Sequence, residues 1–196
     1  MTARFLLLAL PLAASLAGCI SFGAKPPEAL LTLTATAAVP VGNAQDSAAA
    51  KSIVIDVPVV PQSLATARVP VQATPTSIAY VKEAVWAEPP ARLFARLVSD
   101  TVTSRTGRVV LSPVQAISDP SSRLGGELRT FGLDAASNSA VVTFDGALTR
   151  AGDDRIEKRR FEARVPVAAI DAASAGTALN EAANQVAAEV ADWIGR

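Results

Sequence analysis

The sequence predicts a single α+β domain, in which two main helices pack on one face of an antiparallel or mixed β-sheet. Three observations support this. Apolar and polar side chains alternate along 140–149 and 155–167, which predicts strands. Apolar side chains recur at helical spacings along 90–103 and 175–194, which predicts two amphipathic helices. The alternation changes parity inside 123–134, which is typical of a strand with a β-bulge.

The N-terminal segment combines a positive residue, Arg4, with an apolar run of about a dozen residues that ends at Leu-Ala-Gly-Cys. This run is too short to cross a bilayer, which takes ~20 apolar residues. Residues 16–19 resemble a bacterial lipobox, which implies cleavage between Gly18 and Cys19 and attachment of diacylglycerol and fatty acyl chains such as palmitate to Cys19. The alternative is an ordinary secretory signal followed by a free thiol, which is unusual in an oxidising compartment.

These features divide the chain into a lipoprotein signal peptide at 1–18, a lipidated flexible tether at 19–28 and a folded domain at 29–196. The tether contains a glycine and two prolines, which disfavour regular structure. Ile20 rather than Asp follows Cys19. By resemblance to enterobacterial lipoproteins, this implies the periplasmic face of the outer membrane of a Gram-negative cell.

The charges of the whole chain balance, with 18 basic and 18 acidic residues. A balanced surface without a basic stripe argues against nucleic acid as a partner. The chain has no histidine, and its one cysteine is assigned to the lipid, so the usual zinc ligands and the Ser-His-Asp and Cys-His catalytic sets are missing. We therefore expect a protein that is not an enzyme, with no catalytic residues, no metal and no cofactor beyond the covalent lipid on Cys19.

The first half of the domain is expected to contain short strands. Leucine and threonine alternate over 29–38, which predicts a half-buried strand, and 52–60 predicts another. Pro58 has no backbone N–H to donate, so this second strand should lie at a sheet edge or end there. Shorter extended pieces are expected at 68–71 and 78–81.

The first helix should begin at Pro89-Pro90, because proline is tolerated in the first helical turn. It should run to about Thr103, with Gly107 as the C-cap and a short strand at 108–111 after it. In the second half, the bulge is placed near Arg129-Thr130 and a hairpin turn at 135–139.

The expected core comprises Val142, Phe144, Phe161, Val165, Phe94, Leu97, Val186 and Val190. Among the polar residues, Thr143, Asn180 and Asn184 are expected on outward faces of their elements.

Residues 78–88 carry the one tyrosine, Tyr80, and one of the two tryptophans, Trp86. Together with Lys82 and Glu83, which are expected in a turn, these aromatics form a candidate partner surface. The alternative is that both aromatic rings close the core beside the first helix. We interpret the charge cluster at 156–160 as a solvated hairpin end, and Asp153-Asp154 as a turn rather than a cation site.

Several of these features together resemble the ABC-type transport auxiliary lipoprotein family. They are the lipobox, the alternating segment 29–38, the stretch from Ile78-Ala79-Tyr80 to Trp86-Ala87-Glu88-Pro89-Pro90, the hairpin of 124–148 with Phe131, and the closing amphipathic helix.

The resemblance implies an outer-membrane lipoprotein that works with an MCE-domain protein and with the permease and ATPase of an ABC transporter. Such systems move phospholipids or other lipids between two membranes, and this protein would dock the conduit at the outer membrane. A homo-oligomer is left open. The alternative function is a structural, sensing or assembly accessory lipoprotein of the cell envelope.

Overall fold

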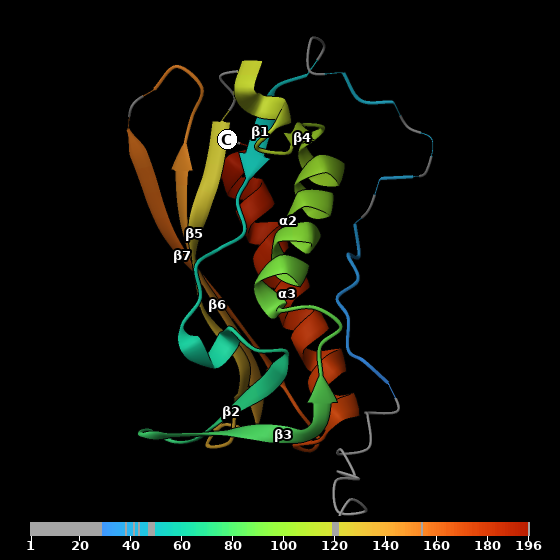
Figure 1. Ribbon diagram of the computed structural model, residues 1–196, viewed down its shortest axis with the longest axis vertical. Coiled ribbons are helices and arrows are strands. Elements are labelled where there is room, and N and C mark those ends of the chain that lie inside the picture. The colour runs from blue at the N-terminus through green and yellow to red at the C-terminus, as the bar shows by residue number, and fades with distance from the viewer. Residues whose placement is uncertain are drawn as a thin grey trace, which may run out of the picture.

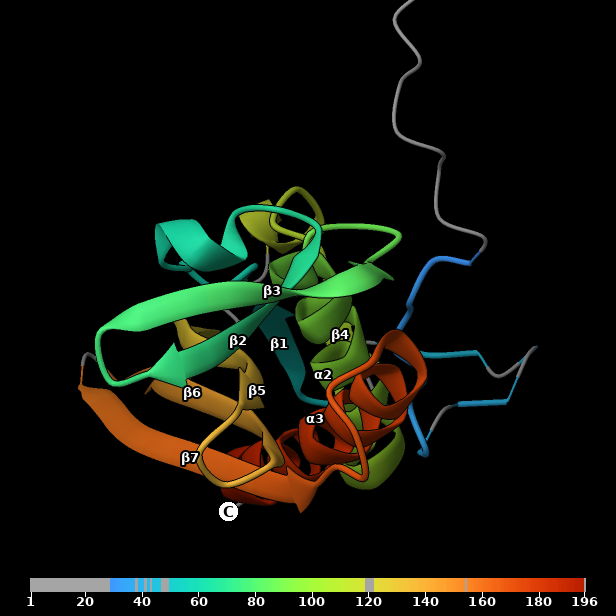
Figure 2. The same cartoon turned by 90° about the horizontal axis from the view of Figure 1, so that it is seen from below.

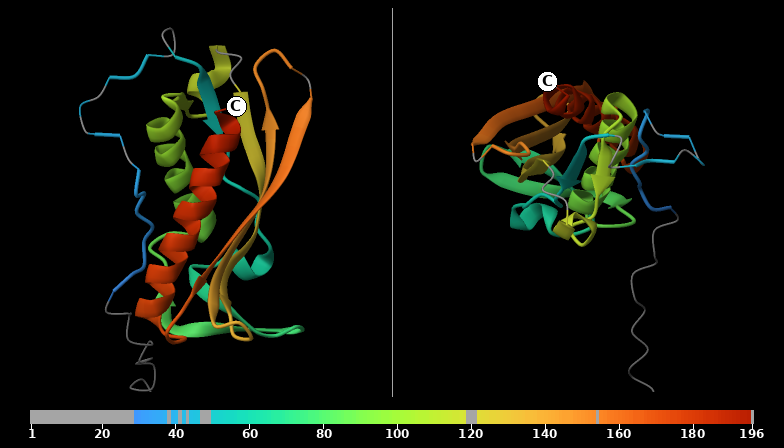
Figure 3. Two further views of the ribbon diagram at one scale, coloured as in Figure 1. Left: turned by 180° about the vertical axis from the view of Figure 1, so that it is seen from behind. Right: turned by 90° about the horizontal axis from the view of Figure 1, so that it is seen from above.

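The computed structural model describes residues 29–37, 39, 40, 42, 44–46, 50–118, 122–153 and 155–195. The predicted signal peptide and tether lie outside the described residues, so the division at 18 and 28 stays a prediction. In the described part, a mixed seven-stranded sheet is covered on one face by α2 (Pro90–Thr106) and α3 (Ala172–Ile194), which lie side by side (Figures 1 and 3). This confirms the predicted α+β class.

In chain order, the strands are β1 (Ser52–Ile55), β2 (Arg68–Thr74), β3 (Ser77–Val85), β4 (Val109–Leu111), β5 (Ser122–Asp134), β6 (Ser139–Thr149) and β7 (Ile156–Pro166). Short 3-10 helices, η2 (Gln62–Leu64) and η3 (Gln115–Ser118), lie in the connections.

Strand β5 is the centre of the sheet. Along one edge it pairs with β6 in an antiparallel ladder, and β6 in turn pairs with β7. Its other edge pairs in parallel with three separate pieces: β1 beside 122–124, Val59 beside Glu127, and β2 beside Leu133 and Asp134. Residues 52–72 therefore follow β5 as one interrupted strand, to which β4 and β3 are added as neighbours.

The strand predicted at 52–60 is thus shorter than expected, and of the two alternatives expected from Pro58 the edge position is wrong while an end of the strand before Pro58 is confirmed. β1 ends at Ile55, the chain returns to the ladder for one bridge at Val59, and β1 lies between β5 and β4 rather than at an edge. Pro58 lies in the gap between the two contacts, where its missing N–H interrupts no ladder.

The bulge predicted in β5 is confirmed by a register shift between Leu128 and Thr130. Leu128 lies before the shift and Phe131 after it. They are three residues apart and would face opposite sides of a regular strand, but the bulge turns both into the core, where both are fully buried. Farther along β5, Gly132 lies so close to β2 that a Cβ would be 2.4 Å from the carbonyl oxygen of Pro70.

The two helices have the predicted phase. Pro90 occupies the first turn of α2, and Gly107 ends it in the left-handed conformation with φ 68°. The Asp171 carboxylate caps α3 by accepting a hydrogen bond from the Ser174 backbone N–H at 2.8 Å. All eight residues predicted for the core are buried. The core also contains a continuous series of ring contacts through Trp86, Phe131, Phe94, Phe144, Phe161 and Trp193.

Two further local predictions are corrected by the structure, and a third is confirmed. The segment 29–38 is not a sheet strand: it makes one bridge, at Leu31, and then runs along α3. β3 does not end in a turn at Lys82 but continues through an irregularity in which Glu83 has φ 59°. Thr143 lies on the outward face, as predicted, where its hydroxyl donates to the Glu162 carboxylate at 2.9 Å and leaves it only 6% exposed.

Candidate functional site

The predicted cleavage and lipidation residues, Gly18 and Cys19, lie outside the described residues, and their roles stay predictions. The chain is first described at Ala29, ten residues after Cys19. The way in which the following residues join the domain determines how a lipid anchor would hold it. We call residues 29–37 the attachment segment.

Leu31 fixes the start of the attachment segment to the domain. Its N–H donates to the Val85 carbonyl and its carbonyl accepts from the Ala87 N–H, both at 2.8 Å. Its half-buried side chain packs against Gly176 in the first turns of α3, where a Cβ would lie only 2.8 Å from Leu31 Cδ2. A glycine at this position therefore leaves room for the leucine between the end of β3 and α3.

Two asparagines one helical turn apart hold the rest of the attachment segment on α3. Asn180 Oδ1 accepts from the Thr34 N–H at 2.8 Å. Asn184 Oδ1 accepts from the Thr36 N–H at 2.8 Å, and Asn184 Nδ2 donates to the Thr34 carbonyl at 2.9 Å. The segment has the alternating exposure of a strand, but side chains of a helix supply its hydrogen-bond partners.

The expected solvent-facing role of these asparagines is therefore wrong, and Asn184 is only 8% exposed. Sequence reasoning placed them on the polar face by helical phase alone. One signal in the sequence could have identified them as binding residues. Asn180 and Asn184 are four residues apart in an alanine-rich helix, and this spacing places both amide side chains on the same face of the helix. Their partners lie about 150 residues earlier and cannot be identified from the helix itself.

The antiparallel hairpin of β2 and β3 carries most of the predicted partner surface. Its inner face is closed against the core by Val69, Val71 and Val81. The opposite side presents Arg68, Gln72, Ile78 and Tyr80, which we call the outer hairpin face. The Arg68 guanidinium lies 4.1 Å from the centroid of the Tyr80 ring, and Ile78 is 50% exposed.

The four predicted surface residues do not form one surface. Trp86 is 1% exposed, its ring meets Phe131 edge-on at 5.4 Å, and its Nε1 has no hydrogen-bond partner among the described residues. Trp86 is thus a core residue, as in the alternative interpretation, and it is removed from the candidate surface. Lys82 and Glu83 are highly exposed and 3.7 Å apart, a pair that contributes little to stability. Tyr80 is half-buried under Arg68.

A groove of about 730 Å³ crosses β5, β6 and β7 and is lined by Val59, Glu127, Asp145, Ala147, Lys158 and Arg160, among others. Asp145 and Ala147 alternate with the buried Phe144, which places them on the sheet face away from the helices. Arg160 binds both oxygens of Asp145, at 2.6 and 2.7 Å, and this contact lowers the pKa of the carboxyl.

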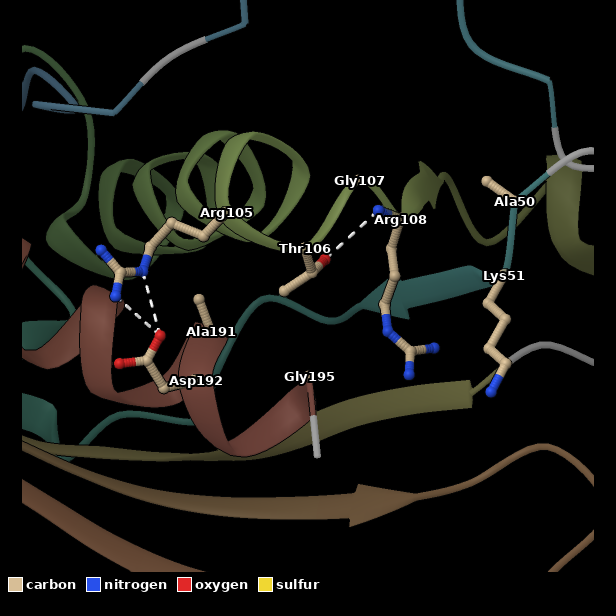
Figure 4. Close-up of a pocket in the computed structure, with 9 residues that line it drawn as sticks. All are labelled: Ala50, Lys51, Arg105, Thr106, Gly107, Arg108, Ala191, Asp192 and Gly195. Atoms are coloured by element: carbon tan, nitrogen blue, oxygen red, sulfur yellow. Dashed lines mark hydrogen bonds and ion pairs between the residues drawn. The ribbon is translucent and has the colours of Figure 1, made fainter.

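A second hollow of about 620 Å³ lies at the C-terminal ends of both helices (Figure 4). Arg105 of α2 reaches Asp192 of α3 at 2.7 Å, and Arg108 donates to the Ile194 carbonyl at 3.2 Å. The pKa of Arg108 is lowered, mainly because the guanidinium is partly buried and secondly because the positive charge of Arg150 lies nearby. Cations at a helix C-terminus satisfy carbonyls that the helix leaves unpaired, so this cluster has a structural role.

The charged turn and cluster between β6 and β7 are also internally paired. Asp153 accepts from both the backbone and the guanidinium of Arg155, which lowers its pKa to about 2. Asp154 lies outside the described residues. Glu157 pairs with Arg150 at 2.6 Å, and the Arg159 guanidinium lies over the Phe161 ring. These contacts agree with the interpretation of 156–160 as a solvated hairpin end and of Asp153 as part of a turn.

The described residues contain no group of three or more His, Cys, Asp and Glu side chains placed to hold a metal ion. In the same part of the chain, we find no helix that is both long and apolar enough to span a membrane. The candidate functional features are therefore the attachment segment, the exposed hairpin of β2 and β3, and the face of β5, β6 and β7 on which charged side chains are paired.

Comparisons with known proteins agree with this architecture. A family model described as "ABC-type transport auxiliary lipoprotein component" matches residues 31–191. Among curated proteins, none matches the sequence significantly. The crystal structure of a Xanthomonas campestris protein of the DUF330 family is similar with a TM-score of 0.70 at 20% identity, over 85% of this chain and 94% of that chain. The crystal structure of an uncharacterized protein is similar with a TM-score of 0.64 at 17% identity, over 74% of this chain and 92% of that chain.

Proposed function

This chain belongs to the ABC-type transport auxiliary lipoprotein family, and from that membership we propose that it is a lipid-anchored protein on the periplasmic face of the outer membrane. There it docks a lipid-transport system made of an MCE-domain protein and the permease and ATPase of an ABC transporter. Its contribution is positional rather than enzymatic. The transported cargo is a phospholipid or a related lipid.

The observation that carries the proposal is the attachment segment. Nine residues lie between Cys19 and Ala29, and the ten steps from one to the other limit the distance between anchor and domain to ~35 Å at full extension. Leu31 and Thr36 then bind the segment to β3 and α3. A lipid on Cys19 would therefore hold the domain close to its membrane through a short link, as a docking component requires.

We place the protein–protein contact on β7. Within the described residues, β7 pairs with β6 alone, so its other edge presents unpaired backbone groups to a partner strand. The groove beside it is lined by Lys158 and Arg160. A strand of the MCE-domain protein added at this edge would lie next to that groove.

Changing the target membrane tests the anchoring part of the proposal. Ile20→Asp should redirect the protein to the inner membrane in a host that follows the enterobacterial sorting rule, while Ile20→Ser is the matched control. We expect the Asp variant to fold normally but to fail to complement the envelope defect of a deletion strain. Full complementation by the Asp variant would instead favour an accessory lipoprotein whose membrane does not matter.

Photo-crosslinking in cells tests the contact surface. A crosslinking residue at Glu162, which is exposed on β7, should capture the MCE-domain protein. The same residue at Arg92, which is exposed on α2, is the control. Equal capture from both positions, or capture from Arg92 alone, would show that β7 is not the docking edge.

A further inference from the structure

We propose that the outer hairpin face, made of Arg68, Gln72, Ile78 and Tyr80, rests on the surface of the bilayer that holds the lipid anchor. This inference rests on the proposed lipidation of Cys19 and adds a second contact between the domain and its membrane. The occupant is the headgroup region of a phospholipid bilayer rather than a protein.

The anchor and the hairpin belong to the same end of the molecule. The attachment segment begins at the lower end in Figure 1, and the hairpin of β2 and β3 lies across that end. Figure 2, seen from below, shows the hairpin spanning it. The link is also chemical, because Leu31 is hydrogen-bonded to Val85, the last residue of β3. A short tether therefore keeps the attached end of the hairpin near the membrane.

The lengths of the tether and the hairpin are comparable. The ten steps from Cys19 to Ala29 reach ~35 Å at most. The nine residues of β3 span ~30 Å from the attachment point to the hairpin turn. A domain held at this distance can lay the whole hairpin against the bilayer without stretching its tether.

The composition of the hairpin suits a membrane interface. No charged residue occurs from 69 to 81, and the side chains from 72 to 79 are all exposed. Ile78 is half-exposed with an apolar side chain, while Tyr80 combines an apolar ring with a hydroxyl that can stay in the headgroup layer. Arg68 above the Tyr80 ring can present its guanidinium to lipid phosphates while its stem remains on apolar surface.

Nearby carboxylates do not oppose this contact. Asp134, which pairs with β2 at the end of β5, stays ionised, but the Arg164 guanidinium lies 3.6 Å from it and offsets its charge. Glu83 lies beside Lys82 at 3.7 Å. The outer hairpin face therefore brings Arg68 to the headgroups as its one charged residue, and the nearby acidic side chains each have a basic neighbour.

An exposed isoleucine at the other end of the molecule provides a comparison. Ile156 is 64% exposed at the start of β7, but it is surrounded in sequence by Arg155, Glu157 and Lys158. The β6–β7 turn that precedes it lies at the opposite end of the long axis from the hairpin (Figure 1). Ile156 thus matches Ile78 in type and exposure but not in position or neighbours.

The full lipidated protein tests this inference, since its one natural cysteine would be occupied by the lipid. Ile78→Cys and Ile156→Cys each introduce a single free thiol for an environment-sensitive fluorophore. The labelled proteins are incorporated into vesicles of phosphatidylethanolamine and phosphatidylglycerol. We expect the probe at 78 to shift its emission to the blue and to be quenched several-fold more by headgroup-labelled quencher lipid than the probe at 156. Quenching by aqueous iodide should follow the opposite order.

Vesicle flotation separates this inference from the proposed anchoring. If both proteins float with the vesicles but positions 78 and 156 are equally accessible to iodide, the hairpin contact is wrong and the anchor stands. If neither floats, the lipidation itself fails. If position 78 is shielded only after a purified MCE-domain partner is added, the outer hairpin face binds protein, and the membrane contact is again overturned.

Discussion

Asn184→Ala should weaken the attachment of residues 34–36 to α3 while leaving the domain folded. The side chain accepts hydrogen bonds from the Thr36 N–H at 2.8 Å and the Thr36 hydroxyl at 3.1 Å, and it donates to the Thr34 carbonyl at 2.9 Å. These three bonds join the segment to the helix. With a net value near 1 kcal/mol each and some recovery by water, their loss should weaken local attachment by about 2 kcal/mol.

The same substitution has an opposite effect on the helix. Asn184 also donates to the Asn180 carbonyl within α3, but alanine favours helix interiors over asparagine by about 0.5 kcal/mol. The free energy of global unfolding should therefore change much less than the local attachment does. A local loss of about 2 kcal/mol corresponds to about a 30-fold rise in the opening equilibrium of the segment.

Residue-resolved amide hydrogen exchange measures this rise. In Asn184→Ala, the Thr36 N–H should exchange faster by that factor, while the Thr34 N–H keeps its bond to Asn180. Asn180→Ala should give the reverse pattern. Gln185→Ala, whose exposed amide reaches only Glu181 at 3.3 Å, is the matched control. Unchanged Thr36 exchange in Asn184→Ala, or a uniform rise across α3 and the sheet, would refute the local attachment that we infer.

Three other perturbations test the packing and the charges. Phe144→Ala should lower the free energy of unfolding by ~3–5 kcal/mol in denaturant titrations, because the ring is buried between other rings of the core. Gly132→Ala should destabilise the fold, because its Cβ would lie 2.4 Å from the Pro70 carbonyl oxygen and must push β2 away from β5. The pKa of Asp153, followed by NMR, should be about 2 and should rise toward 3.8 in Arg155→Ala.

The controls for these tests lie close to the altered residues. Gly125→Ala, in the same strand as Gly132, meets nothing nearer than 3.6 Å and should be tolerated. The pKa of Asp153 is lowered in the folded state, so its favourable contact is fully present above about pH 4. The contact is lost as the pH falls toward 2. A stabilising Gly132→Ala or an Asp153 pKa near 4 in the unaltered protein would contradict the geometry described here.

The spacing of apolar side chains was sufficient to predict the helices and strands that bury one continuous face in the core. The two helices, the β5 bulge and the buried positions of β6 and β7 follow from repeating apolar side chains, and each is confirmed. The attachment segment shows why the same reasoning fails elsewhere. Alternating apolar and polar side chains indicate only that one side of an extended chain is buried. They do not show whether its backbone is hydrogen-bonded to a neighbouring strand or, as here, to Asn180 and Asn184 on a helix.

The remaining errors also concern partners distant in sequence. The place of β1 inside the sheet depends on β4 and β5, which follow it by more than fifty residues. For the candidate site, the sequence indicated residues 78–88 as a surface. It could not separate the partly exposed Tyr80 from the buried Trp86, because both are aromatic residues in one short stretch.

The interrupted strand along β5 determines where the chain can change in length. Between Ile55 and Val59 the chain advances four residues while its partners on β5 advance three, which leaves one residue of slack. Between Val59 and Val71 it advances twelve residues while β5 advances six, and η2 occupies the surplus. Insertions and deletions should therefore be absorbed around η2. In 56–58 only one residue could be removed without a change of register, and a longer deletion would shift β1 against β5 and turn its buried side chains toward solvent.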